Sequence, residues 1–387
     1  MKKILYFGFL ALILVGCEEI IPEYTPYYNE PKTESIIPIN ELPRIAEDGT
    51  VWYVSDRTAK VYWLKDGVIK SLPNYSQGYW VYGYQTLGND FYYLERNFLF
   101  KHSYDSVTVL ETPLTSFTSD MPSGDYTIDA TDNNIILRSP YSRTYYVFTD
   151  SGWEQKSFPS NISYYNVDLK MYSRGNYVLI PQEHKIFNII TQELATFAPT
   201  FVYEGQEISI SYDKQCFDQQ GNVYGLAGGR LIRRNFATQT TEGIDVTIPG
   251  IDQSEIILVR VSKNNDIWVF FSHYNSNYFS IYKIGSGSFT ETEIYKNDYT
   301  MPSTSFADSN GLFWVYYNNT STIKAYNSSG QLLNRDFPYF DYSNNIFRED
   351  KSGAMWFGTL LGGDQPYIYK YKNGVWTDLS RFFEYRN

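Results

Sequence analysis

Side chains that commonly do acid–base or metal chemistry are scarce in this sequence. It contains three histidines, His102, His184 and His273, and 82 and 89 residues separate them along the chain. No close metal-ligand spacing, nucleophile elbow or phosphate loop accompanies them. We therefore expect each histidine to be an ordinary strand or loop residue. We predict no catalytic residue, no cofactor and no metal ion.

The cysteines and the Asp-x-x-Gly sequences are the other candidates for chemistry. Cys17 follows an apolar N-terminal stretch, whereas Cys216 falls in a predicted inner strand, where a buried, inert thiol is the usual state. Lipid attachment to one cysteine would leave no partner for an intramolecular disulfide. Asp218, Asp308 and Asp350 offer oxygen atoms of the type that calcium binds, but each turn supplies only one or two of them. We interpret these sequences as hairpin turns with a side-chain acceptor and a glycine of positive φ.

One short pattern recurs through most of the chain. Residues 350–357 form a polar turn followed by an apolar run centred on Trp356, and degraded copies recur every 40 to 46 residues. A period in the low forties built from short β runs is typical of a β-propeller with four-stranded blades. We predict an all-β fold with eight blades over residues 44–387, with seven blades as the alternative. The equivalent positions, here called the register residues, are Trp52, Tyr92, Ile136, Val178, Tyr224, Trp268, Trp314 and Trp356.

The last repeat shows the four strands of a blade most clearly. In a propeller the first-to-second and third-to-outer turns lie on one face, here called the turn face. The second-to-third loops and the connections between blades lie on the opposite face, here called the loop face. From the axis outwards, we expect the strands of the last blade at residues 345–349, 354–359, 367–372 and 375–379.

The longest segments between predicted strands fall on the loop face, and they are rich in aromatic residues and asparagine. Binding residues gather on longer loops held by a rigid scaffold, so we expect a ligand on this face. Exposed aromatic rings beside Asn, Ser and Arg suit sugar rings and protein surfaces equally well. Packing of these aromatics against the propeller rim is an open alternative. The candidate binding residues are Tyr79, Trp80, Tyr141, Arg143, Tyr274 and Tyr278.

The first seventeen residues are organised as an export signal. Lys2 and Lys3 precede an apolar stretch at residues 4–15, and Leu-Val-Gly-Cys follows, ending at Cys17. Twelve residues at about 1.5 Å each fall short of a bilayer core of about 30 Å, so we interpret the segment as a processed signal. Residues 18–43 carry five prolines among polar residues and tyrosines, and we expect them to form a semi-extended tether.

Two resemblances bear on the location of the protein. Leu-Val-Gly-Cys resembles the bacterial lipoprotein box, whose cysteine becomes lipidated, and Glu18 with Glu19 resembles the surface-export signal of Bacteroidetes lipoproteins. They imply an outer-membrane protein that faces the cell exterior, with the periplasmic side as the alternative. Without Lys2 and Lys3 the chain has 30 basic and 43 acidic residues, a net charge of −13. This charge disfavours nucleic acid and anionic lipid as partners, so the lipid would be the only contact with the membrane.

The last repeat resembles the two-component-regulator propeller repeat at residues 349–359 and 369–376, and residues 46–52 and 308–314 match it less fully. In that family, common in Bacteroidetes, such repeats form periplasmic sensor propellers of hybrid histidine kinases that recognise glycan fragments. We find no transmembrane helix and no kinase segment in this sequence. The resemblance implies the fold and a ligand-binding habit, without a set of residues to transfer.

These observations favour a non-catalytic envelope lipoprotein that binds a glycan or a partner protein of an uptake complex on its loop face. The alternative is an enzyme, because streptogramin lyases and several polysaccharide-degrading enzymes are also propellers with similar repeats. Such lyases commonly use paired histidines and a metal ion, which three scattered histidines fit poorly. A purely structural role in an assembly is not separated from binding by the sequence.

Overall fold

A computed structural model describes the protein between residues 32 and 385, with internal gaps. The residues outside the description are 1–31, 56–59, 73–80, 96–97, 105, 114–126, 132, 140–141, 150, 168–172, 212–214, 245–255, 273–278, 285–288, 293–303, 318–320, 328–329, 337–344, 361–365 and 386–387.

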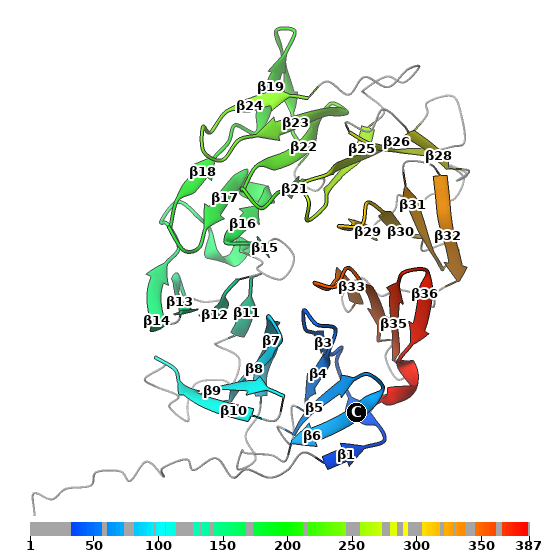
Figure 1. The fold of residues 1–387 in the computed structure, drawn as a ribbon. Coiled ribbons are helices and arrows are strands. Elements are labelled where there is room, and N and C mark those ends of the chain that lie inside the picture. The colour runs from blue at the N-terminus through cyan, green and yellow to red at the C-terminus, as the bar shows by residue number, and fades with distance from the viewer. Residues whose placement is uncertain are drawn as a thin grey trace, which may run out of the picture.

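Eight antiparallel sheets stand in a ring around a central axis, and each sheet is one blade (Figure 1). The strands of a blade follow one another in sequence from the axis outwards. Helix in the described segments is limited to single 3₁₀ turns. The predicted all-β propeller is therefore confirmed, with eight blades rather than seven.

The first four blades are formed as follows. Blade 1 contains β3 (Arg44–Ile45), β4 (Val51–Val54), β5 (Val61–Lys65) and β6 (Val68–Leu72). Blade 2 contains β7 (Val81–Leu87), β8 (Asp90–Glu95), β9 (Phe98–Ser103) and β10 (Ser106–Glu111). Blade 3 contains β11 (Thr127–Ala130), β12 (Ile135–Arg138), β13 (Thr144–Thr149) and β14 (Gly152–Ser157). Blade 4 contains β15 (Ser173–Arg174), β16 (Tyr177–Ile180), β17 (Lys185–Asn188) and β18 (Leu194–Thr196).

The other four blades repeat this order. Blade 5 contains β21 (Cys216–Phe217), β22 (Val223–Ala227), β23 (Arg230–Arg234) and β24 (Thr241–Gly243). Blade 6 contains β25 (Ile256–Val261), β26 (Ile267–Ser272), β27 (Phe279–Lys283) and β28 (Phe289–Thr292). Blade 7 contains β29 (Thr304–Ala307), β30 (Phe313–Tyr317), β31 (Thr322–Asn327) and β32 (Gly330–Asp336). Blade 8 contains β33 (Asn345–Glu349), β34 (Met355–Thr359), β35 (Tyr367–Lys372) and β36 (Val375–Asp378), within one residue of the predicted strands.

Residues 32–43, which the sequence assigned to the tether, are part of the propeller. β1 (Lys32–Glu34) pairs antiparallel with β6 as a fifth strand of blade 1, and β2 (Ile37–Ile39) pairs in parallel with β37 (Phe383–Tyr385). Ile37 and Ile39 are at most 1% exposed, so the segment joins the core. Proline at position 38 is tolerated because β2 has only one paired edge. The predicted boundary at residue 44 therefore lies too late in the chain.

A hairpin that the repeat did not predict is inserted between blades 4 and 5. It consists of β19 (Thr200–Tyr203) and β20 (Gln206–Ser209), and it projects from the rim at the top of Figure 1. The hairpin contacts blade 5 through Tyr203 of β19, because the Arg230 guanidinium of β23 lies 3.7 Å from the centroid of the Tyr203 ring.

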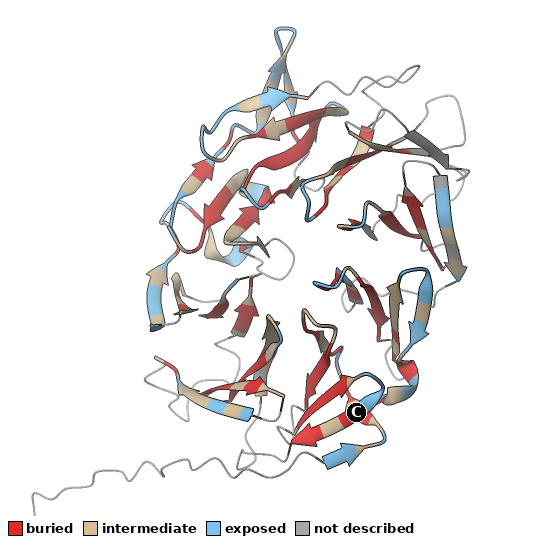
Figure 2. Ribbon diagram, in the orientation of Figure 1, coloured by how far each residue is buried: buried red, intermediate tan, exposed pale blue. Residues whose placement is uncertain are grey.

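The register residues form the packing between blades. All eight lie on second strands and are at most 6% exposed, while outer strands such as β24 and β36 carry mostly exposed residues (Figure 2). Each hydrophobic cluster at a blade interface joins neighbouring blades; for example, Trp268 of blade 6 contacts Phe313 of blade 7 at a centroid distance of 5.8 Å. Trp52 and Trp356 share one cluster, so blade 8 packs on blade 1 and the ring is closed. The assignment of these residues to the core is confirmed.

In three blades, an aspartate in the first turn bonds both to the turn backbone and to the register residue in the core. In blade 8, Asp350 Oδ1 accepts the N–H groups of Ser352 and Ala354 at 2.8 and 3.0 Å, and Oδ2 accepts the Trp356 indole N–H at 2.9 Å. Asp308 holds Trp314 in the same way at 2.8 Å, and Asp218 accepts the Tyr224 hydroxyl at 3.2 Å. These contacts confirm the interpretation of the Asp-x-x-Gly sequences as turns.

Two of the four blades whose register residue is tryptophan lack this aspartate. Ala46 and Ser262 stand six residues before Trp52 and Trp268, where the other turns have Asp350 or Asp308. The indole N–H groups of Trp52 and Trp268 have no hydrogen-bond partner among the described residues. A buried donor without a partner costs about 1–3 kcal/mol. Stacking of Trp52 on Phe91, with an interplanar angle of 3°, is one contact that stabilises the indole instead.

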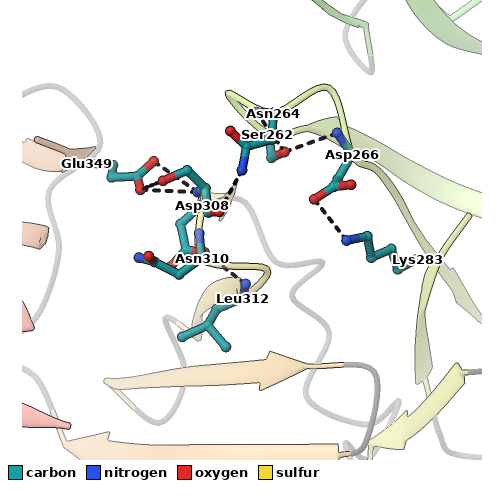
Figure 3. A network of polar contacts seen from close by, with 9 residues as sticks. Ser262, Asn264, Asp266, Lys283, Asp308, Asn310, Leu312 and Glu349 are labelled. Carbon is teal, nitrogen blue, oxygen red and sulfur yellow. Dashed lines mark hydrogen bonds and ion pairs between the residues drawn. The ribbon is translucent and has the colours of Figure 1, made fainter. Parts of the chain in front are cut away.

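Hydrogen bonds also join neighbouring turns on the turn face. The Asn264 side chain of blade 6 donates to the Ser309 carbonyl of blade 7 at 2.7 Å, and the Ser309 N–H donates to the Glu349 carboxylate of blade 8 at 3.1 Å (Figure 3). The Asn310 side chain adds a bond to the Gly353 carbonyl at 2.8 Å. The turns of blades 6, 7 and 8 are therefore fixed to one another.

The same face is tied across the junction between the first and last blades. The Lys351 N–H donates to the Glu47 carbonyl at 3.0 Å, and the Glu47 N–H donates to the Gly88 carbonyl of blade 2 at 3.0 Å. In blades 3 and 4, the Asn134 side chain donates to the side-chain oxygen of Asn176 at 2.9 Å. The turn face is thus a hydrogen-bonded rim, which leaves the loop face to carry the longer connections.

Replacing Trp356 with alanine should lower the free energy of unfolding by about 3–5 kcal/mol, because neighbouring blades cannot collapse into the cavity. Urea denaturation measures the change. The control is Val375→Ala on β36, where the side chain is 63% exposed and the expected change is below about 0.5 kcal/mol. A loss below about 1 kcal/mol for Trp356→Ala would contradict its assigned packing role.

Candidate functional site

Most residues predicted to bind a ligand lie outside the described part of the chain, so their roles stay predictions. These residues are Tyr79, Trp80, Tyr141, Tyr274 and Tyr278. His273 and the lipidation candidate Cys17 are also outside it. Arg143 is the predicted binding residue that the structure describes.

Arg143 lies on the loop face of blade 3, directly before β13. Its Nη1 donates to the carbonyls of Pro159 and Ile162 at 2.7 and 2.9 Å, and its guanidinium carbon lies 5.4 Å from the centroid of the Tyr164 ring. The side chain therefore holds the connection between blades 3 and 4 against the end of blade 3. This is a positioning role, and direct contact of Arg143 with a ligand stays a prediction.

The held connection presents two adjacent tyrosines, here called the tyrosine pair. Tyr164 and Tyr165 belong to the 3₁₀ turn η1 (Tyr164–Asn166), and their ring centroids are 4.1 Å apart at an interplanar angle of 33°. The Tyr164 hydroxyl donates to the Tyr165 hydroxyl at 2.7 Å. That hydrogen bond raises the pKa of Tyr164, so its hydroxyl stays protonated at neutral pH. Tyr165 is 68% exposed, an unusual state for so large a ring.

Blade 4 supports the tyrosine pair from the other side. Glu183 in η2 (Pro181–Glu183) accepts the Ser163 N–H at 3.0 Å and the Asn166 side chain at 3.1 Å. Lys185 forms an ion pair with the same carboxylate at 2.8 Å. Burial alone would raise the pKa of Glu183, but the hydrogen bonds from Lys185, Asn166 and Ser163 together lower it, so the carboxylate stays charged.

The arrangement can bind a ligand by stacking. The exposed Tyr165 ring lies against the partly buried Tyr164 ring, and Asn166, Glu183 and Lys185 lie beside the pair as polar groups. Because blades 3 and 4 both hold η1, little side-chain and loop freedom is left to be lost on binding. A sugar ring, with an apolar C–H face and hydroxyl edges, matches this combination of groups.

The sequence reasoning missed the tyrosine pair, although a signal for it was present. Ser163-Tyr164-Tyr165-Asn166 has the same mixture of aromatic and polar residues as the segments around Trp80, Tyr141 and Tyr278. Copies three and four of the repeat are the most degraded, so the connection between them could not be delimited.

The described histidines do not form a catalytic pair. His102 on β9 is 0% exposed and stacks on Tyr93 at a centroid distance of 5.4 Å. His184, in the loop before β17, has Nδ1 at 3.4 Å from both terminal nitrogens of Arg234. The two imidazoles lie in different blades, as predicted for isolated strand and loop residues. No group of three or more His, Cys, Asp and Glu side chains suited to a metal ion occurs among the residues with described positions.

Cys216 lies on the inner strand β21, as predicted, and is partly rather than fully buried. Desolvation raises the pKa of its thiol to about 12. Since the thiolate is the reactive form, this cysteine is not an activated nucleophile at neutral pH.

Comparisons with known proteins leave the activity open. No protein-family model and no curated protein matches the chain. Among solved structures, virginiamycin B lyase from Staphylococcus aureus is similar at 12% identity, over 77% of this chain and 83% of that one, with a TM-score of 0.30. Within the described residues, no helix is long and apolar enough to cross a membrane.

Two further similar structures are an extracellular domain and a bacterial surface component. The extracellular domain of a putative hybrid two component system from B. thetaiotaomicron is 14% identical over 91% of this chain and 56% of that one, with a TM-score of 0.36. PorZ, a surface component of the type-IX secretion system of Porphyromonas gingivalis, is 13% identical over 92% of this chain and 47% of that one, with a TM-score of 0.28. At these identities and TM-scores, the similarities assign no activity to this chain.

Burial of His102 should make the protein sensitive to acid. Burial lowers the pKa of His102 from 6.5 to about 3, so only the unfolded chain takes up the proton between these values. The folding free energy gained while His102 is neutral in both states is fully present above about pH 6.5. It is lost as the pH falls toward 3, by about 1.4 kcal/mol per pH unit, because the unfolded chain is then stabilised by protonation. His102→Leu should reduce the slope of unfolding free energy against pH over this range, as measured by urea denaturation between about pH 7 and 4.5. His184→Gln, at a partly exposed site, is the control and should reduce this slope less. Equal slopes for wild type and His102→Leu would refute the assignment of acid sensitivity to His102.

Proposed function

We propose that this protein is a non-catalytic lipoprotein of the cell envelope that binds a glycan on the loop face of its propeller. The observation that carries the proposal is the tyrosine pair, an exposed aromatic surface held in place by contacts from two blades. Tyr164 packs on the core of blades 3 and 4 and carries the exposed Tyr165 ring, so that ring loses little freedom when a ligand stacks on it. The loop face is also where the sequence placed its other candidate aromatics.

A glycan fits the site better than a protein surface. Protein interfaces bury about 800 Å² on each partner and are centred on a desolvated hydrophobic core. The tyrosine pair is small, and charged or amide side chains such as Glu183, Lys185 and Asn166 surround it. One or two sugar rings could cover the aromatic surface while their hydroxyls bond to these polar groups. A protein partner of an uptake complex is the competing outcome of the test below.

The proposed location rests on the Leu-Val-Gly-Cys sequence ending at Cys17 and on the two glutamates after it. Lipid on Cys17 would anchor the protein in the outer membrane, facing the exterior, with a periplasmic orientation as the alternative. Because β1 begins at Lys32, the tether would comprise residues 18–31 and span at most about 50 Å. The anchor would then join the propeller at blade 1.

The tyrosine pair should be required for glycan binding. In the mature chain carrying Cys17→Ser, Tyr165→Ala should weaken binding of a glycan found on an array at least about tenfold, with the melting temperature changed by less than about 2 °C. The control is Val375→Ser, where a side chain of similar exposure, 63% against 68% for Tyr165, lies on the turn face. Unchanged binding in Tyr165→Ala would place the ligand elsewhere. No glycan response, together with saturable binding of a partner protein, would replace the glycan by that partner, and turnover of a bound glycan would refute the non-catalytic assignment.

Lipidation should be the only means of membrane attachment. Cys17→Ala should release the protein from the membrane fraction, because a domain of net negative charge has no other strong attraction to a bilayer. Metabolic labelling with a fatty acid and fractionation in high salt measure the two effects. Continued salt-resistant fractionation of Cys17→Ala with membranes would refute the lipid anchor.

A further inference from the structure

The Arg143 side chain uses one of its three guanidinium nitrogens to hold the connection between blades 3 and 4. Its Nη1 donates to the carbonyls of Pro159 and Ile162 at 2.7 and 2.9 Å. The Nε and Nη2 atoms carry the other N–H groups, and these donate to no group in the part of the chain that the structure describes. Neither atom is one of the buried polar atoms without a hydrogen-bond partner, and Arg143 is partly exposed. This edge of the guanidinium is therefore open to solvent.

The charge of Arg143 is not cancelled by a carboxylate of the described residues. The groups that it contacts there are two neutral carbonyls and the Tyr164 ring. The other two charged residues that hold the connection, Glu183 and Lys185, form an ion pair at 2.8 Å, and their side chains are 15% and 14% exposed. That pair is neutral as a whole. Among these three residues, the accessible charge is the positive charge of Arg143.

This charge lies beside the tyrosine pair. The Arg143 guanidinium carbon is 5.4 Å from the centroid of the Tyr164 ring, and the centroids of Tyr164 and Tyr165 are 4.1 Å apart. These two distances place the guanidinium within about 10 Å of the exposed Tyr165 ring, a length that two or three linked sugar residues can span. One glycan chain can therefore contact both.

We propose that the glycan bound by the tyrosine pair is acidic and that Arg143 binds the carboxylate of a uronic acid residue within it. This inference rests on the proposed glycan-binding function and names the class of glycan. The Nε–H and one Nη2–H of a guanidinium are parallel donors whose spacing matches the two oxygens of a carboxylate. Stacking of a neighbouring sugar residue on Tyr165 would hold the same chain at a second point.

The local contact, rather than the overall field, would give the preference for a uronate. The chain has a net charge of −11, which repels an acidic glycan at long range. A neutral hexose has a hydroxymethyl group in place of the carboxylate, so it offers Arg143 one uncharged oxygen. Hydrogen bonds with a charged partner are about twice as strong as neutral ones. Acidic and neutral glycans of the same shape should therefore be distinguished at Arg143.

The test compares pairs of glycans that differ in this one group. The mature Cys17→Ser chain is screened on an array of galacturonate, glucuronate, mannuronate and guluronate oligosaccharides, each beside its carboxyl-reduced, neutral counterpart, together with sulfated glycans. Calorimetry then measures both members of the pair that binds best. We expect the wild type to bind the uronate at least about tenfold more tightly than the reduced glycan. This ratio of affinities is here called the carboxylate preference.

Two variants of Arg143 separate contact with the ligand from a structural role. Arg143→Lys keeps the charge and a donor for one carbonyl but loses the paired Nε and Nη2 donors, so the carboxylate preference should fall at least about threefold. Arg143→Gln also loses the charge, and its preference should fall to within about twofold of one. An arginine that only positions the connection would weaken binding of both glycans equally and leave the preference unchanged.

Two further variants are controls. Tyr165→Ala should weaken binding of both glycans and keep the carboxylate preference. Arg381→Gln replaces an exposed arginine in η4 (Ser380–Phe382), beyond the outer strand of blade 8, and should change neither affinity by more than about twofold. Equal loss of preference in Arg381→Gln and Arg143→Gln would indicate a general charge effect and refute the contact.

The outcomes also separate this inference from the proposed function. A wild type that binds neutral or sulfated glycans alone, or both members of each pair equally, refutes the uronate while glycan binding stands. A preference unchanged in both Arg143 variants refutes the role of Arg143. Absence of any glycan response refutes the proposed function and this inference with it. If Arg143→Gln does not fold, as judged by its melting temperature, the preference of Arg143→Lys decides.

Discussion

The structure depends on the burial of large side chains between blades. A four-stranded sheet of this length exposes apolar residues on both faces, and it becomes stable only when each face meets another sheet. Trp52, Trp268, Trp314 and Trp356 fill four of the interfaces, and each is at most 1% exposed. Because every blade needs two neighbours, the ring must close, and blade 8 must meet blade 1. The parallel pairing of β2 with β37 makes that closure a main-chain contact between the two ends of the described chain.

Closure and turn chemistry are connected through the aspartates. Asp308 and Asp350 fix the backbone of a turn with one carboxylate oxygen and the orientation of a core indole with the other. Local turn preference and packing between blades therefore favour the same conformation, which is the consistency expected of a sequence that folds to one structure. Hydrogen bonds between neighbouring turns then fix the blades to one another on the turn face. The connections on the loop face do not have to fix the blades, so they can vary in length and carry exposed rings.

The sequence predicts what the repeat contains and fails where the chain departs from it. The register residues and the strands of blade 8 are periodic, so the amino-acid pattern alone locates both. β2 could not be located in this way, because its partner lies far away at the other end of the chain and a closing strand occurs once. The β19–β20 hairpin is an insertion and shares no repeat signal.

The tyrosine pair was hidden from the sequence for a physical reason. Tyr164 and Tyr165 have the right residue types, yet their neighbouring repeats are too degraded to delimit the loop. Their support comes from Arg143 of blade 3 and Glu183 of blade 4, which meet only when the two blades pack together.

The two faces differ in what they can offer a ligand. On the turn face, hydrogen bonds between neighbouring turns, such as Asn264 with Ser309 and Lys351 with Glu47, occupy the polar groups of the turns. On the loop face, Arg143 and Glu183 hold the connection between blades 3 and 4 while the Tyr165 ring stays 68% exposed. The polar groups of that connection are therefore satisfied by the protein, and an aromatic surface is left for a ligand. The rigidity of one face leaves recognition to the other.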